Sequence, residues 1–147
     1  MKRVLFLCTG NSCRSQLAEA IVNHTLEGEW QAVSAGTQPA GYVHPLAFQV
    51  LEEIGIHHQG YSKHVDAFRQ DNFDLVVTVC DSAAETCPVW LGAGKRVHLG
   101  FRDPAAATGS TERILGVFRQ VRDEIAEQIP ALLRQKWLET HLPDAAP

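Results

Sequence analysis

The fold of this chain is decided by residues 4–16, which read VLFLCTGNSCRSQ. Val4 to Leu7 is a continuous apolar run, which is typical of a strand buried on both faces. Small and turn-forming residues follow at 8–12, and from Ser15 onward apolar side chains return at the spacing of one helix face until Gly28. The stretch therefore predicts a core strand, a tight loop and a helix.

The same alternation continues along the rest of the chain. Apolar runs predict further strands at 32–35, 74–79 and 96–99, and helical spacing predicts helices at 44–55 and 114–129. Pro130 is expected to kink or end the last helix. Strands that alternate with helices indicate a parallel sheet with right-handed crossovers. The predicted fold class is α/β, a small doubly wound four-stranded parallel sheet with helices on both faces.

Length and composition indicate one folded domain. The chain has 147 residues, of which 45% are hydrophobic and 20% are charged, as in ordinary globular proteins. We expect a single domain over 1–137 and a tail over 138–147. The net charge of −4 and the scattered basic residues argue against nucleic-acid binding. No apolar stretch is long enough for a membrane span or a signal peptide, so we expect a cytoplasmic protein, acting as a monomer.

The loop after the first strand carries the candidate chemistry. A short loop that leads into a helix directs backbone N–H groups, together with the positive end of the helix dipole, toward a tetrahedral oxyanion. The same field favours a thiolate, so Cys8 is expected to be an activated nucleophile, and the planar fork of Arg14 could grip two oxygens of the anion. The plainer alternative is a buried cysteine and a surface charge. The predicted oxyanion-binding residues are Thr9, Gly10, Asn11, Ser12, Cys13, Arg14 and Ser15.

These residues resemble a known family. Residues 4–16 are similar to the anion-binding loop shared by low-molecular-weight protein tyrosine phosphatases and the arsenate reductases of the same fold. Ser34 to Thr37 is similar to the signature of the family's second strand, and Asp103-Pro104 to its general-acid motif. The resemblance extends to about residue 130 and implies that Asp103 donates a proton during catalysis.

Two further cysteines separate the two branches of this family. Phosphate-ester hydrolysis needs one thiolate, whereas reduction of an oxyanion needs two electrons, which thiols supply by forming a disulfide. Besides Cys8, the chain has Cys80 and Cys87 in a segment with several turn-forming residues. If that segment were helical, the two thiols would lie about 10 Å apart along the axis, beyond disulfide range, and it would have to unwind. The alternatives are two core cysteines or a zinc site, and the spacing disfavours zinc.

The resemblance implies the reduction of arsenate to arsenite. Cys8 would form the arsenic adduct, Cys80 and Cys87 would complete a disulfide relay, and thioredoxin would regenerate the enzyme without a bound cofactor or metal. The alternatives are a low-molecular-weight tyrosine phosphatase and a non-enzymatic anion sensor. Some related reductases bind potassium through residues that match Asn11, Glu19 and Ser34. An acidic ligand expected near 62–64 is missing here.

The seven histidines give no comparable signal, because none lies in a pattern that indicates catalysis.

Overall fold

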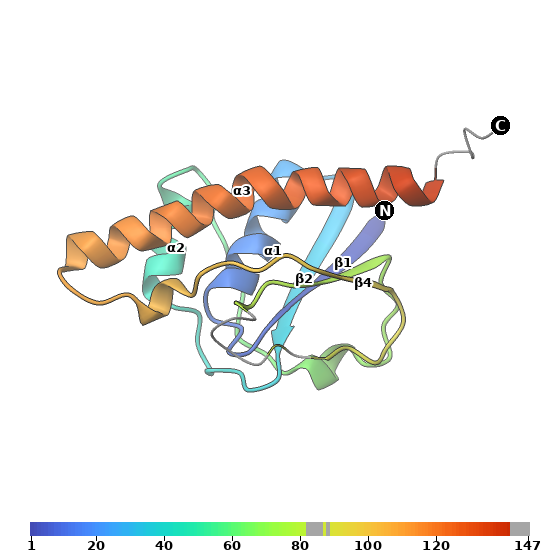
Figure 1. Cartoon of the computed structure of the whole chain (residues 1–147), viewed down its shortest axis with the longest axis horizontal. Coiled ribbons are helices and arrows are strands. Elements are labelled where there is room, and N and C mark those ends of the chain that lie inside the picture. The colour runs from blue at the N-terminus through green and yellow to red at the C-terminus, as the bar shows by residue number, and fades with distance from the viewer. Residues whose placement is uncertain (82–86, 88, 142–147) are drawn as a thin grey trace.

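The computed structural model describes residues 1–81, 87 and 89–141, and its element order alternates as the sequence predicts (Figure 1). The elements are β1 (Lys2–Cys8), α1 (Arg14–Thr25), β2 (Trp30–Gly36), α2 (Pro45–Glu52), the 3-10 helix η1 (Val65–Phe68), β3 (Leu75–Thr78), β4 (Lys95–His98), the 3-10 helix η2 (Pro104–Ala106) and α3 (Thr111–His141). Each predicted strand and helix is present, with boundaries shifted by up to three residues except at the end of the last helix.

The strands form one parallel sheet in the order β2-β1-β3-β4. β1 lies in the interior of the sheet, where Leu5 is paired with Val33 of β2 and Val76 of β3. This confirms the predicted four-stranded parallel sheet. Because all strands run the same way, the residues that follow β1, β3 and β4 meet at one edge, where ligands bind in sheets of this kind.

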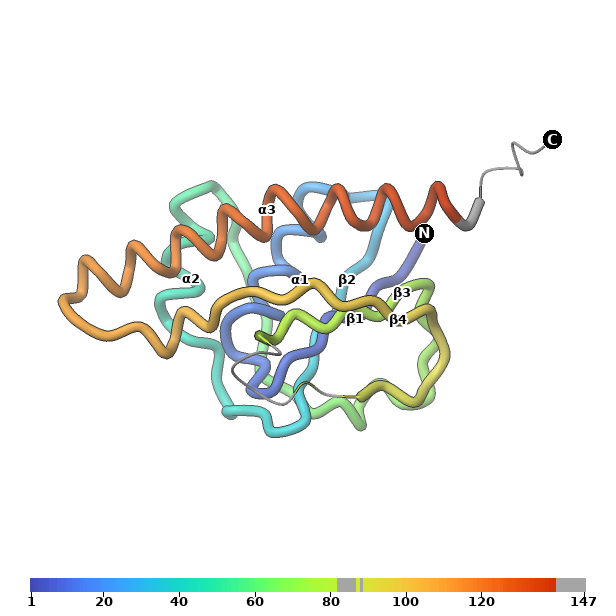
Figure 2. The backbone as a smooth tube through the Cα atoms, viewed as in Figure 1, coloured from blue at the N-terminus to red at the C-terminus, as the bar shows by residue number. Residues whose placement is uncertain are grey.

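Different elements pack on the two faces of the sheet. Val4 and Phe6 of β1 belong to the larger core with residues of α1, α2 and α3, and the tube in Figure 2 shows α3 running along this side. Leu5 and Leu7 point to the opposite face, where they pack with Val65 of η1 and other apolar side chains. Helices are therefore present on both faces, but among the described residues the second face is covered by the short 3-10 helix η1.

α3 continues through Pro130 to His141, rather than ending at the proline. Proline removes one helical hydrogen bond, but Ile129 and Leu133 on either side of it are fully buried, and their packing keeps the helix in place. Trp137 packs edge to face on Trp30 of β2, with ring centroids 6.3 Å apart. The first four residues of the predicted tail, 138–141, are thus helical. Within the described residues, no helix combines the length and apolarity needed to cross a membrane.

Candidate active site

The loop between β1 and α1 is held in place by hydrogen bonds from its backbone carbonyls to a neighbouring segment. The carbonyl oxygens of Thr9, Gly10 and Ser12 accept hydrogen bonds of 2.9–3.0 Å from backbone amides in the segment 38–44. Because a peptide plane places its N–H opposite its C=O, carbonyls held outward turn the N–H groups of the loop inward. Gly36 permits this approach, since a Cβ there would overlap the carbonyl oxygen of Thr9.

The loop encloses a small cavity at the carboxyl edge of the sheet. The cavity has a volume of about 80 Å³. Its lining residues are Cys8, Gly10, Asn11, Ser12, Cys13, Arg14, Asp103 and Ala105. Six of the residues predicted from the sequence therefore line one cavity together with Asp103, whereas Thr9 and Ser15 are not part of its wall.

The Cys8 thiol is buried and bonded to a serine of the helix. Cys8 Sγ lies 2.9 Å from Ser15 Oγ, and Asn11 Nδ2 donates to the same oxygen at 2.8 Å. Because Ser15 Oγ accepts from Asn11, its own hydrogen can point to the sulfur and stabilise a thiolate. Asn11 has a φ of 47°, in the left-handed region that asparagine tolerates, whereas Gly10 does not adopt a positive φ.

Asn11 is in turn held by two groups from other parts of the chain. Its Oδ1 accepts from Gln16 Nε2 at 3.1 Å and from the backbone amide of Lys63 at 3.0 Å. Gln16 Oε1 lies 2.7 Å from His58 Nε2, so the amide of Gln16 is oriented as well. A polar network thus runs from His58 through Gln16 to the groups that contact Cys8.

A buried ion pair is connected to this network through Lys63. Lys63 Nζ lies 3.7 Å from Glu19 Oε1, which also accepts a hydrogen bond of 3.0 Å from Ser34. Burial raises the pKa of Glu19 and lowers the pKa of Lys63, while each charge opposes the shift of the other. Lys63 occupies the segment where the resemblance would place an acidic potassium ligand. Its ammonium group brings a positive charge to the Glu19 carboxylate instead.

Arg14 is buried at the first turn of α1 and faces the opposite wall. Its NH1 donates to the carbonyl oxygen of Phe101 at 3.2 Å, and its NH2 lies 3.8 Å from Asp103 Oδ2. Asp103 is more exposed, and its Oδ1 accepts from the amide of Ala105 at 3.0 Å as the cap of η2. The guanidinium and the carboxyl group are therefore held on the same cavity as Cys8.

The second cysteine of the loop has a different character. Burial raises the pKa of the Cys13 thiol to about 12, and the nearby charges of Asp103 and Cys8 act in the same direction. Cys13 therefore stays protonated at neutral pH, and it is not an equivalent nucleophile.

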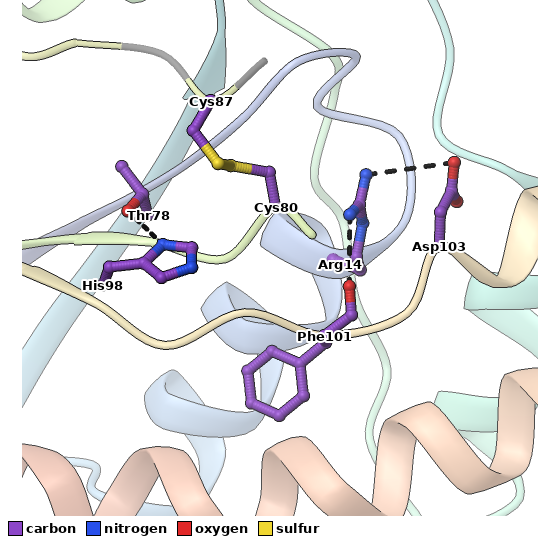
Figure 3. The surroundings of a disulfide bond; sticks show 7 residues. All are labelled: Arg14, Thr78, Cys80, Cys87, His98, Phe101 and Asp103. Carbon is purple, nitrogen blue, oxygen red and sulfur yellow. Dashed lines mark hydrogen bonds and ion pairs between the residues drawn. A yellow bond between two sulfur atoms is a disulfide. The ribbon is translucent and has the colours of Figure 1, made fainter. Parts of the chain in front are cut away.

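Cys80 and Cys87 form a disulfide next to this cavity (Figure 3). Their Cα atoms are 5.8 Å apart, well below the roughly 10 Å that two helical turns would impose. Cys80 is fully buried and Cys87 only partly. Residues 82–86 and 88, which belong to the segment predicted to open, lie outside the described residues. Since the Val79 amide donates to the Leu7 carbonyl, Cys80 follows β3 directly beside the end of β1 that carries Cys8.

Three parts of this site were missed at the sequence level. Phe101 contributes only its carbonyl oxygen, for which the side chain gives no signal. Lys63 lies in a poorly patterned loop, and His98 lies at the end of β4. The sulfur atoms of Cys80 and Cys87 and a ring nitrogen of His98 lie within 4.8 Å of one another, as in a metal site, but both sulfurs are bonded in the disulfide. The position of His98 at a strand end was the one available clue.

Comparisons with known proteins agree with this geometry. The model of the low molecular weight phosphotyrosine protein phosphatase family matches residues 3–142. An arsenate reductase of Shouchella clausii is 44% identical over 131 residues, which cover 87% of this chain and 92% of that protein.

Solved structures give the same result. An arsenate reductase in the phosphate binding state has a TM-score of 0.73 at 31% identity and covers 92% of this chain and 98% of its own. A thioredoxin-dependent arsenate reductase of Corynebacterium glutamicum has a TM-score of 0.63 at 25% identity and covers 92% and 63% of the two chains. Arsenate reductases are among its relatives at 43–46% identity, and the chain belongs to the low molecular weight phosphotyrosine protein phosphatase family.

Proposed function

We propose that this protein reduces arsenate to arsenite and is regenerated by thioredoxin. The observation that carries the proposal is the Cys80–Cys87 disulfide beside a cavity that contains both Cys8 and Arg14. A phosphatase would need the cavity but not a pair of cysteines able to store two electrons. The identity to arsenate reductases over most of the chain supports the same choice.

The first step is the formation of a covalent adduct in the cavity. The Cys8 thiolate, which accepts the hydrogen bond of Ser15, attacks arsenic, and Asp103 protonates the oxygen that leaves as water. Arg14 and the inward N–H groups of 9–15 hold the remaining oxygens and stabilise the charge that develops on them. Asp103 suits its role because it lies on the cavity wall and is accessible to solvent.

The second stage transfers two electrons to arsenic. The Cys80 thiolate attacks Cys8 Sγ, the sulfur–arsenic bond breaks, and its electron pair remains on arsenic, which leaves as arsenite. Cys87 then attacks Cys80, which frees Cys8 and leaves the disulfide seen in the structure. Thioredoxin returns two electrons to that disulfide through its more exposed sulfur, Cys87. Because such a cycle needs an environment that keeps thiols reduced, we place it in the cytoplasm.

The decisive experiment compares two activities in three forms of the protein. Arsenite production is measured with thioredoxin, thioredoxin reductase and NADPH, next to the hydrolysis of an aryl phosphate. Wild type should produce arsenite over many turnovers. Cys87→Ser should release about one equivalent of arsenite and then stop, while any phosphatase activity survives. Cys8→Ser should lose both activities.

Each rival predicts a different pattern in this experiment. A phosphatase would hydrolyse the aryl phosphate and give no arsenite with any reductant. An anion sensor would bind arsenate or phosphate without turnover of either substrate. Continued multiple turnover by Cys87→Ser would contradict the relay, because no partner cysteine would remain for Cys80.

A further inference from the structure

The disulfide has an imidazole next to it. A ring nitrogen of His98 lies within 4.8 Å of the sulfur atoms of Cys80 and Cys87, and Figure 3 shows the ring at the end of its strand beside the disulfide. His98 Nδ1 is 2.7 Å from Thr78 Oγ1 on the neighbouring strand β3, so the ring orientation is held. His98 itself is exposed, and its ring can exchange protons with water.

The two sulfurs differ in the solvation of the thiolate that each would form. Cys80 is fully buried, whereas Cys87 is partly exposed, so an incoming thiolate reaches Cys87. The sulfur–sulfur bond then breaks with its electron pair on Cys80. A thiolate in a buried position has lost its hydration and is a poor leaving group unless it receives a proton or an opposite charge.

The groups around the disulfide differ in their ability to supply that proton. Figure 3 shows Arg14, Asp103 and His98 among the charged or titratable side chains near the disulfide. Arg14 does not release its proton in this pH range, and Asp103 is held toward Arg14 on the oxyanion cavity. Imidazole is the side-chain type best suited to proton transfer near neutral pH, and His98 places one within 4.8 Å of both sulfurs.

We propose that His98 is the proton donor to Cys80 when an external dithiol of the thioredoxin type reduces the Cys80–Cys87 disulfide. This inference rests on the proposed function. The external thiolate attacks Cys87 Sγ and forms a mixed disulfide, and the Cys80–Cys87 bond breaks. Cys80 leaves with the electron pair and takes the proton of the His98 imidazolium, which becomes neutral. The second thiol of the reductant then releases Cys87.

The test follows the reduction step alone, so it does not depend on arsenate. Wild type and His98→Gln are oxidised to the Cys80–Cys87 disulfide, and the rate of reduction by excess reduced thioredoxin is measured by stopped-flow fluorescence from pH 6 to pH 9. Glutamine can still contact Thr78 but does not titrate. Taking the ratio of the two rates removes the pH dependence of thioredoxin itself.

We expect wild type to be about ten- to hundredfold faster at pH 6 and the ratio to fall toward one as the pH rises to 9, because general-acid catalysis needs a protonated donor. The control His57→Gln removes an exposed histidine paired with Glu52 and should follow wild type throughout. Thr78→Val should lower the rate while keeping the pH dependence of the ratio.

A merely structural role of His98 would give a ratio above one that does not change with pH. That result, or a ratio of one at every pH, would overturn the assignment. Loss of arsenite production in wild type would instead overturn the proposed function, so the two failures are distinguishable.

Discussion

Replacing Lys63 by methionine should destabilise the protein by an amount that depends strongly on pH. The ammonium group of Lys63 lies 3.7 Å from Glu19 Oε1, and the two side chains are only 11% and 10% exposed. Lys63→Met preserves most of the apolar stem and removes the charge. The carboxylate of Glu19 is then left buried, with the hydroxyl of Ser34 donating to Oε1 and His58 Nε2 at 3.6 Å from Oε2.

Two estimates give the size of the effect. At a separation of 3.7 Å and an effective dielectric constant of about 20, the attraction is about 4 kcal/mol. Glu19 can also avoid the cost of an unpaired buried charge by binding a proton. Protonation costs about 1.4 kcal/mol for each pH unit above its ordinary pKa of 4.5. This limits the loss to about 4 kcal/mol at pH 7.5 and to about 1.4 kcal/mol at pH 5.5.

The sign of the pH dependence follows from the shifted pKa. In Lys63→Met the folded-state pKa of Glu19 rises further, because burial still raises it and the opposing charge of Lys63 is gone. The folded protein then binds a proton more readily than the unfolded chain. The contribution of Glu19 to stability is therefore most favourable at acidic pH and is lost as the pH rises through that folded-state pKa.

Urea unfolding of wild type and variants at pH 5.5 and pH 7.5 measures the effect. Lys63→Met/Glu19→Gln should recover most of the stability, because glutamine keeps an acceptor for Ser34 and carries no charge. Arg134→Met, which breaks an exposed pair with Glu29, should cost less than about 1 kcal/mol. A loss for Lys63→Met that is equal at both pH values would refute the reasoning, because the buried charge would then not be its cause.

Three further predictions concern other parts of the fold. Burial lowers the pKa of His58 to about 4, so on acidification the unfolded chain binds a proton at a higher pH than the folded protein does. Wild type should therefore lose about 2 kcal/mol of stability between pH 7.5 and pH 5. In the same urea titration, His58→Gln should not show this loss. Asn11→Ala should be less stable than Asn11→Gly by about 1 kcal/mol because of the φ of 47°, and single-turnover arsenite release should be slow in both. Trp137→Ala should cost about 2 kcal/mol by thermal unfolding through lost packing on Trp30, against less than about 0.5 kcal/mol for the exposed Leu138→Ala.

Local sequence patterns determined the order of elements and the anion-binding loop. A run such as Val4 to Leu7 is apolar at every position because both faces of β1 are buried, and this can be recognised without knowing its neighbours. The loop at 8–15 is also readable, because turn-forming residues between a strand and a helix dictate its local geometry. Arg14 and Cys8 reach the same cavity within one short stretch of chain.

Contacts between distant segments could not be predicted in this way. The hydrogen bond from Arg14 to Phe101 joins residues 87 positions apart and uses a carbonyl oxygen that every residue possesses. The ion pair of Lys63 with Glu19 and the position of His98 beside Cys80 likewise depend on how loops cross the edge of the sheet.

The continuation of α3 past Pro130 shows the same difference between local sequence patterns and tertiary contacts. The proline alone predicts an interruption, because it removes a hydrogen bond and that loss is a local property. Only the tertiary structure shows that Ile129 and Leu133 are fully buried in the core, where the free energy of their burial outweighs the lost hydrogen bond. Patterns along the chain thus determined which elements this protein has and which cysteine is its candidate nucleophile. The tertiary structure decided which charges, protons and carbonyl groups surround that nucleophile, because burial and electrostatic contact depend on distance in space rather than on separation in sequence.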